Sequence, residues 1–147
     1  MTTEAIELWH KRARPTPTEA DLNVQFGCHI EELVETLDTV SFAFLVEDEV
    51  DYSAAMAALD MLATGLKNGT IQMRIDDRKE FLDGIADQVV TGIGAAHCAG
   101  MKGAAACERV NASNWSKFDH NGQPIRDANG KIAKGPNYKK PELDGLY

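Results

Sequence analysis

Apolar residues recur along the chain at the three- and four-residue spacing of amphipathic helices. Residues 22–47 show this spacing most clearly, at Ile30, Leu33, Val34, Leu37, Val40, Ser41 and Phe44. High helix propensity predicts a second helix over 52–66, which the Asn68-Gly69 pair ends. A third is expected from Asp76 or Asp77 to about residue 100, and a fourth over 104–118. The pattern predicts an all-α fold, a four-helix bundle.

The two ends of the chain differ from this pattern. Residues 1–21 contain one short apolar turn followed by a proline-containing link that cannot be a continuous helix, so we expect an N-terminal arm or lid. Residues 119–147 predict a short β-hairpin with a type I′ turn at Asn129-Gly130, and then an extended tail acting as a flap. We expect residues 1–147 to form a single domain.

Composition and charge exclude several classes of protein. With 147 residues and 44% apolar content, the chain can bury one core. A net charge of −8 disfavours binding to a nucleic-acid polymer. The three cysteines form no CxxC pair, which is typical of a reducing cytoplasm. The longest uncharged stretch has 14 residues, below the roughly 20 that span a bilayer. A soluble, cytoplasmic protein without a membrane partner is therefore expected.

Acidic residues cluster on two of the predicted helices. Glu31, Glu32 and Glu35 lie within one and a half turns of the first helix, largely opposite its apolar stripe. On the third helix Asp83 and Asp87 are four residues apart, with Glu80 beside them. A solvated helix face is the simplest interpretation of the first group on its own.

Asp87 favours a second interpretation, because only Asp87 and Lys102 are charged between residues 84 and 107. We expect so charge-poor a helix to be buried nearly all round, and a buried carboxylate is costly unless a cation or donors offset it. If the first and third helices pack antiparallel, four or five carboxylates converge. Oxygen-only ligation of that kind suits Mg²⁺, so the pattern predicts a magnesium site for phosphates.

Several ordered motifs resemble those of the MazG-like all-α nucleotide pyrophosphohydrolases, the superfamily that includes the phosphoribosyl-ATP pyrophosphohydrolases. The first is the ExxE pair Glu32 and Glu35, followed by an acidic helix. The phage-type members are similar in further motifs: PheGlyCysHisIleGluGlu, AspGlyIleAlaAsp, AsnAlaSerAsnTrpSerLys and LysGlyProAsnTyr. The chain departs from the usual ExxD of the second motif, since its strongest pair is Asp83 and Asp87.

The resemblance implies an Mg²⁺-dependent enzyme, with Mn²⁺ as a substitute, that cleaves a nucleoside triphosphate to its monophosphate and pyrophosphate. It implies metal binding by Glu32, Glu35, Asp83 and Asp87. Glu31 is a further ligand or the group that orients the attacking water, and these three glutamates are the catalytic candidates. Substrate-binding candidates are Asn111, Asn114 and Lys117, on one face of the fourth helix, and Lys134 and Tyr138 in the tail.

Other functions stay open at this point. Phosphoribosyl-ATP is a possible substrate, although a purine nucleotide such as dGTP fits the aromatic and amide side chains of the tail at least as well. A di-iron carboxylate bundle needs two ExxH motifs, and only Glu7 and His10 match one. A non-enzymatic acidic helical interaction protein explains the charge but not Asp87. We expect a homodimer or homotetramer, because small-residue helices can complete a core across a twofold axis.

Overall fold

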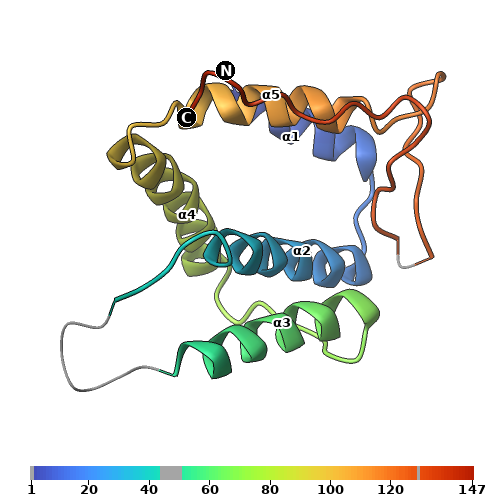
Figure 1. Ribbon diagram of the computed structural model, residues 1–147. Helices are drawn as coiled ribbons and strands as arrows, with labels where there is room; N and C mark the ends of the chain where they lie inside the picture. The colour runs from blue at the N-terminus through green and yellow to red at the C-terminus, as the bar shows by residue number, and fades with distance from the viewer. Residues whose placement is uncertain (1, 44–50, 129) are drawn as a thin grey trace. The chain divides into compact units, whose positions relative to one another are not determined.

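The computed structural model describes residues 2–43, 51–128 and 130–147, and in them the protein is all-helical. Figure 1 shows its α-helices. Their bounds are α1 Thr2–Ala13, α2 Glu19–Leu37, α3 Tyr52–Asn68, α4 Arg78–Cys98 and α5 Gly103–Trp115. The predicted all-α class is confirmed, with five helices in the described residues where the sequence predicts four.

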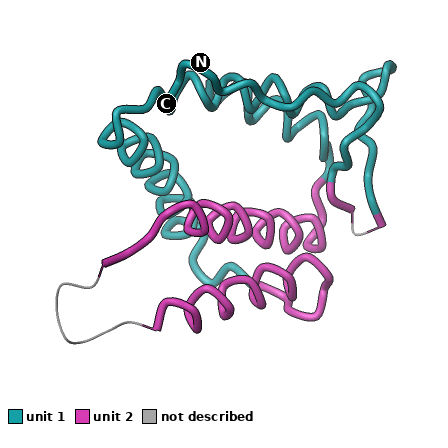
Figure 2. Tube along the Cα trace, viewed as in Figure 1, with its two compact units in different colours: residues 1–16, 74–127, 132–147 teal, residues 17–73, 128–131 magenta. Residues whose placement is uncertain are grey.

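The chain forms two compact units (Figure 2). Unit 1 consists of Met1–Thr16, Arg74–Asp127 and Ile132–Tyr147, and therefore contains α1, α4 and α5. Unit 2 consists of Pro17–Met73 with the short segment Ala128–Lys131, and contains α2 and α3.

In unit 2, α2 and α3 form an antiparallel pair (Figure 1). Thr18 begins α2 with a capping box, since its side chain accepts the Asp21 N–H while the Asp21 carboxylate accepts the Thr18 N–H. Gly69 ends α3 in the left-handed conformation, with φ of 79°. Ile30 of α2 is buried against α3, in a core completed by Ala63 and Leu66.

In unit 1, α1 packs against α5 through aromatic side chains. The Trp9 and Phe118 rings stack with their centroids 5.7 Å apart. Ala13 and Ile132 complete this buried core. The same unit contains α4, which contacts α5 where Gly103 lies close to the Ala96 side chain.

The N-terminal segment and the end of α2 differ from the sequence predictions. The predicted apolar turn is a 12-residue helix, α1, because Trp9 and Ala13 become buried in the core of unit 1, and such tertiary packing supplies most helical stability. The predicted end of the next helix at residue 47 is wrong, since α2 ends at Leu37 and residues 40–43 belong to no helix. The Thr39 hydroxyl donates to the Thr36 carbonyl there, a local bond that competes with continuing the helix. Residues 44–47 lie outside the described residues.

The remaining helix predictions are confirmed to within a few residues. The hairpin stays a prediction, because the described residues show one antiparallel bridge on either side of its expected turn. An isolated antiparallel bridge joins Arg126 and Ile132. The predicted turn type depends on Asn129, which lies outside the described residues.

The prediction that the third helix is buried nearly all round is wrong for the single chain. No residue of α4 is buried, and Leu82 and Val90 are 69% and 68% exposed. The scarcity of charge in the sequence favoured burial, but α4 is also rich in small residues, which form few contacts. Among the helices of the described residues, none is long and apolar enough to cross a membrane.

Candidate functional site

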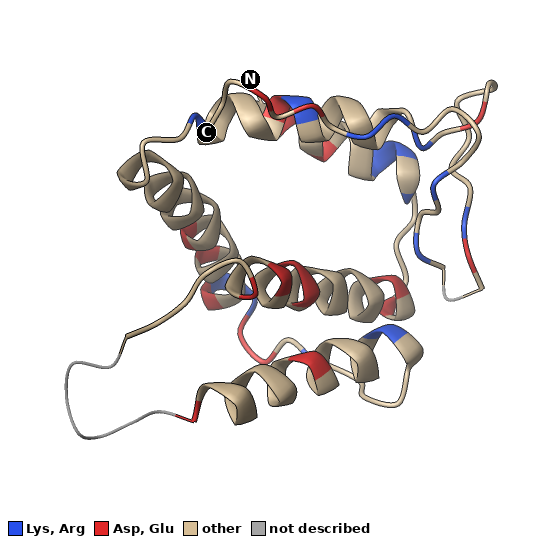
Figure 3. Ribbon diagram, in the orientation of Figure 1, with Lys and Arg blue, Asp and Glu red and all other residues tan. Residues whose placement is uncertain are grey.

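The three glutamates of α2 differ in their surroundings, although the sequence places them within one and a half turns. Figure 3 shows the acidic residues along α2. Glu32 and Glu35 are exposed, whereas the Glu31 side chain is 26% exposed. Within the part of the chain that the structure describes, no basic side chain forms an ion pair with Glu32 or Glu35. Glu31 is therefore the glutamate of this group that α3 and the segment Ala128–Lys131 contact.

Glu31 lies between two lysines from distant parts of the sequence. Lys67, in the last turn of α3, donates a hydrogen bond to one carboxylate oxygen. Lys131 donates to the other oxygen, with Nζ 3.1 Å from Oε2. Burial alone would raise the pKa of Glu31, but the hydrogen bonds and charges of Lys67 and Lys131 outweigh it, so this pKa is lowered. Glu31 is consequently a firmly ionised carboxylate at neutral pH.

A close crossing of α2 and α3 allows Lys67 to reach Glu31. Gly27 is buried in this crossing, where a Cβ atom would lie 2.8 Å from the Ala63 carbonyl oxygen and 2.8 Å from Cγ of Lys67. The absent side chain at Gly27 thus leaves room for the lysine stem. The Lys67 ammonium then meets Glu31, one turn further along α2.

A cavity of about 480 Å³ lies beside Lys67 within unit 2. Its polar lining includes Asn23, Asn68 and Gln72, and its apolar lining includes Val24, Leu66 and Met73. Asn23 is buried and its side-chain oxygen accepts the Met73 N–H at 3.1 Å. The volume falls in the range of small-molecule pockets, but the lining exposes more polar than apolar surface, and Glu19 belongs to it.

The second predicted acid pair belongs to unit 1. Asp83 and Asp87 are both exposed on α4, and Glu80 lies in the first turn of that helix. Neither aspartate forms an ion pair with another described residue. Nor does the described part of the chain contain a cluster of three or more His, Cys, Asp and Glu side chains able to hold a metal ion. The magnesium site thus stays a prediction, built from two groups of exposed acids in separate units.

No protein-family model, curated protein or solved structure matches the chain. The function is therefore argued from the residues and their geometry.

The predicted substrate-binding residues on α5 and the tail lie in unit 1. Asn111 is buried and Asn114 is half-buried. The Lys117 ammonium lies 5.9 Å from the centroid of the Trp9 ring, and that of Lys134 lies 5.1 Å from the centroid of Tyr138. These cation–π pairs give both lysines an intramolecular partner.

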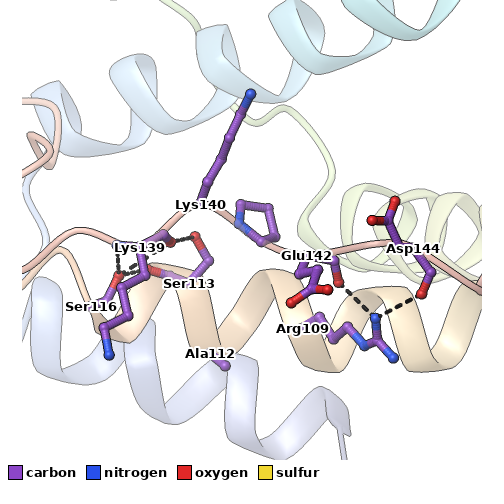
Figure 4. A pocket seen from close by; sticks show the side chains of 9 residues that line it. Arg109, Ala112, Ser113, Ser116, Lys139, Lys140, Glu142 and Asp144 are labelled. Carbon is purple, nitrogen blue, oxygen red and sulfur yellow. Dashed lines mark hydrogen bonds between the residues drawn. The ribbon is translucent and has the colours of Figure 1, made fainter.

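The last nine residues of the tail are attached to α5. Ser113 donates to the Lys139 carbonyl at 2.6 Å, and Arg109 donates to the carbonyls of Glu142 and Asp144 at 2.9 and 3.2 Å. Figure 4 shows these bonds in a pocket of about 420 Å³, with the Lys140 side chain pointing away from α5. The polar side chains of this pocket thus hold residues 139–147 of the tail against α5. Any movement of the predicted flap would therefore involve only tail residues that precede this segment.

Sequence reasoning missed Lys67 and Lys131 as candidates. Lys67 is the single basic residue of α3, which is a weak signal for a role of its charge. Its ion pair with Glu31 spans 36 positions, and that of Lys131 spans 100. Helical periodicity reports only local neighbours, so it could not have found either contact.

Proposed function

We propose that the protein is a magnesium-dependent nucleoside triphosphate pyrophosphohydrolase, which releases a nucleoside monophosphate and pyrophosphate. The observation that carries the proposal is the contrast within one α2 motif. Glu31 is ionised and held by two lysines, whereas Glu32 and Glu35 are exposed and have no ion-pair partner among the described residues. This contrast supports two different roles: Glu31 is held in position by lysines, and Glu32 and Glu35 are available to bind a cation.

The exposed carboxylates have the donor chemistry that Mg²⁺ prefers, because all are hard oxygen ligands and none forms an ion pair with another described residue. In this proposal Glu32, Glu35, Asp83 and Asp87 hold the cation, or Mn²⁺ in its place. When bound, the cation would neutralise phosphate charge and polarise water.

Glu31 has a different role in this proposal. Its lowered pKa keeps the carboxylate ionised, so it can accept a hydrogen bond from the attacking water and orient it. The reaction adds the elements of water across the anhydride between the α and β phosphates. A carboxylate held on both oxygens by lysines is rigid, which suits orientation better than metal binding.

The finer parts of the proposal concern substrate and assembly. We propose a purine nucleotide such as dGTP as substrate, bound with help from Asn111, Asn114, Lys117, Lys134 and Tyr138. The packing of the helices into one bundle, and a homodimer or homotetramer, belong to the same proposal.

The decisive experiment incubates the purified protein with each of the eight common NTPs and dNTPs, with Mg²⁺ or with EDTA, and separates the products by anion exchange. Monophosphate with pyrophosphate, formed only with Mg²⁺, is the expected result. Glu35→Gln and Asp87→Asn should abolish turnover and retain the helical circular dichroism spectrum. Asp60→Asn, at an exposed acid of α3, is the matched control and should retain activity. Intact nucleotides throughout would refute the proposal and favour phosphoribosyl-ATP or a non-enzymatic role.

A further inference from the structure

We propose that the cavity of about 480 Å³ in unit 2 binds a small molecule whose ammonium group lies next to a carbonyl or carboxylate oxygen, as in a free amino acid. Glu19 binds the ammonium group, and the side-chain amides of Asn23 and Asn68 bind the oxygen. None of these residues belongs to the proposed metal site or to the proposed nucleotide contacts. The inference therefore goes beyond the proposed reaction and does not depend on it.

The first argument is a buried amide that keeps one donor free. Asn23 lines the cavity and is only 9% exposed. Its side-chain oxygen accepts the Met73 N–H at 3.1 Å, whereas its NH₂ group forms no hydrogen bond with another described residue. In the described part of the chain, Trp9 Nε1 is the one fully enclosed side-chain polar atom without a partner, so the Asn23 NH₂ group reaches solvent. A buried donor of this kind gains from an acceptor that a ligand supplies.

A second amide donor comes from the end of α3, which lies beside the beginning of α2 (Figure 1). Asn68 is the last residue of α3, and its side-chain oxygen accepts the N–H and the hydroxyl of Thr70 at 3.0 and 2.7 Å. These two bonds orient the amide and leave its NH₂ group without a hydrogen bond to another described residue. Because Asn68 also lines the cavity, two amide donors there require an oxygen acceptor.

The third argument is a carboxylate without an ion-pair partner in the described residues. Glu19 lies one turn before Asn23 on α2, so the two residues share a face of the helix, and both line the cavity. Lys67 is the other charged residue of the lining, but its ammonium group is bound to Glu31. A positively charged N–H donor forms a stronger hydrogen bond with a carboxylate than a neutral donor does. Glu19 therefore favours an ammonium group on the ligand.

These groups together define the class of ligand. The cavity has the volume of a small-molecule pocket, and more of its lining is polar than apolar. A chain of phosphates would bring several negative charges next to Glu19, and a large apolar ligand would leave the amide donors without partners. A free amino acid has an ammonium group and carboxylate oxygens on neighbouring atoms, so it can meet Glu19 and the amides of Asn23 and Asn68 at once.

The test measures binding by isothermal titration calorimetry, without nucleotide and without divalent cations. Each of the twenty standard L-amino acids is titrated into the wild-type protein, and the one that binds most tightly is compared with its amide and its N-acetyl derivative. The amide keeps the ammonium group and a carbonyl oxygen, so its affinity should stay within about tenfold. N-acetylation removes the positive charge and should abolish binding.

Two substitutions test the residues of the site. Glu19→Gln keeps the shape of the side chain, removes its charge and should weaken binding about tenfold or more. Asn23→Ala removes the buried donor and should have an effect of similar size. Asp60→Asn, at an exposed acid of α3 that does not line the cavity, is the matched control and should bind as wild type. Glu19 is exposed, so its variant tests the inference even if Asn23→Ala fails to fold.

Three results would each overturn the inference. The first is that no amino acid binds the wild-type protein with a dissociation constant below about 10 mM. The second is that the N-acetyl derivative binds as tightly as the free amino acid. The third is wild-type affinity in Glu19→Gln. Because no nucleotide is present, these outcomes leave the proposed hydrolysis untouched, and a failure of that reaction leaves the amino-acid site standing.

Discussion

The crossing of α2 and α3 at Gly27 makes a sharp prediction about stability. Glycine inside a helix costs roughly 0.5–1 kcal/mol relative to alanine, so Gly→Ala at an open helical site should stabilise the protein by that amount. Gly27→Ala should do the opposite, because its new methyl group would lie 2.8 Å from the Ala63 carbonyl oxygen and 3.1 Å from Cβ of Leu66. The backbone oxygen cannot rotate away as a flexible side chain could.

The magnitude follows from the two opposing effects. Overpacking of this kind costs about 1–3 kcal/mol, so Gly27→Ala should lower the free energy of unfolding by up to about 2 kcal/mol after the propensity gain. For a chain of this length, each kcal/mol moves the melting temperature by about 2–4 °C. Gly92→Ala is the matched control, since Gly92 lies inside α4 and, apart from its chain neighbours and the backbone of its own helix, no atom lies within 4 Å of the added Cβ.

The assay is thermal and urea unfolding of both variants, followed by far-ultraviolet circular dichroism and compared with wild type. The expected pattern is a stabilised Gly92→Ala and a destabilised Gly27→Ala. Equal stabilisation of both would refute the close crossing, and with it the position of Lys67 beside Glu31.

Two further predictions concern the same unit. Leu66→Ala should cost about 2–5 kcal/mol in urea unfolding, since Leu66 is 2% exposed and its truncation leaves a cavity; a loss below about 1 kcal/mol would contradict this core. The pH dependence of stability should report the ion pairs of Glu31. Because its folded pKa is lowered, the stability difference between wild type and Glu31→Gln should be complete at neutral pH and vanish as the pH falls through that pKa. Lys131 has a raised pKa, so the difference for Lys131→Gln should vanish only as the pH rises through the folded value. A difference that is constant across these ranges in urea titrations would exclude the pairing.

The elements predicted best are those whose signals are local. Asp77 caps α4 by accepting the N–H groups of Lys79 and Glu80, and Gly69 closes α3, both as their residue types indicate. The helix content of the N-terminal segment was underestimated, because Trp9 stacks on Phe118, more than a hundred residues away. A single apolar turn in the sequence carries no information about such a distant partner. The predicted helix was too long at the end of α2 for a related reason. The apolar periodicity continues past Leu37, whereas Thr39 forms local bonds that end the helix.

The acids of α2 show most clearly what spacing can and cannot decide. At i, i+3 and i, i+4, Glu35 shares a face with Glu32 and equally with Glu31, so the sequence leaves two possible pairs. The structure distinguishes them through α3, because Gly27 lets Lys67 approach and Lys131 closes the other side of Glu31. A carboxylate bound to two ammonium groups gains less from a cation than an exposed one does, since its charge is already neutralised. Within the proposed function, Glu32 and Glu35 are therefore the pair that would bind magnesium, and Glu31 is the acid that Lys67 and Lys131 hold in place.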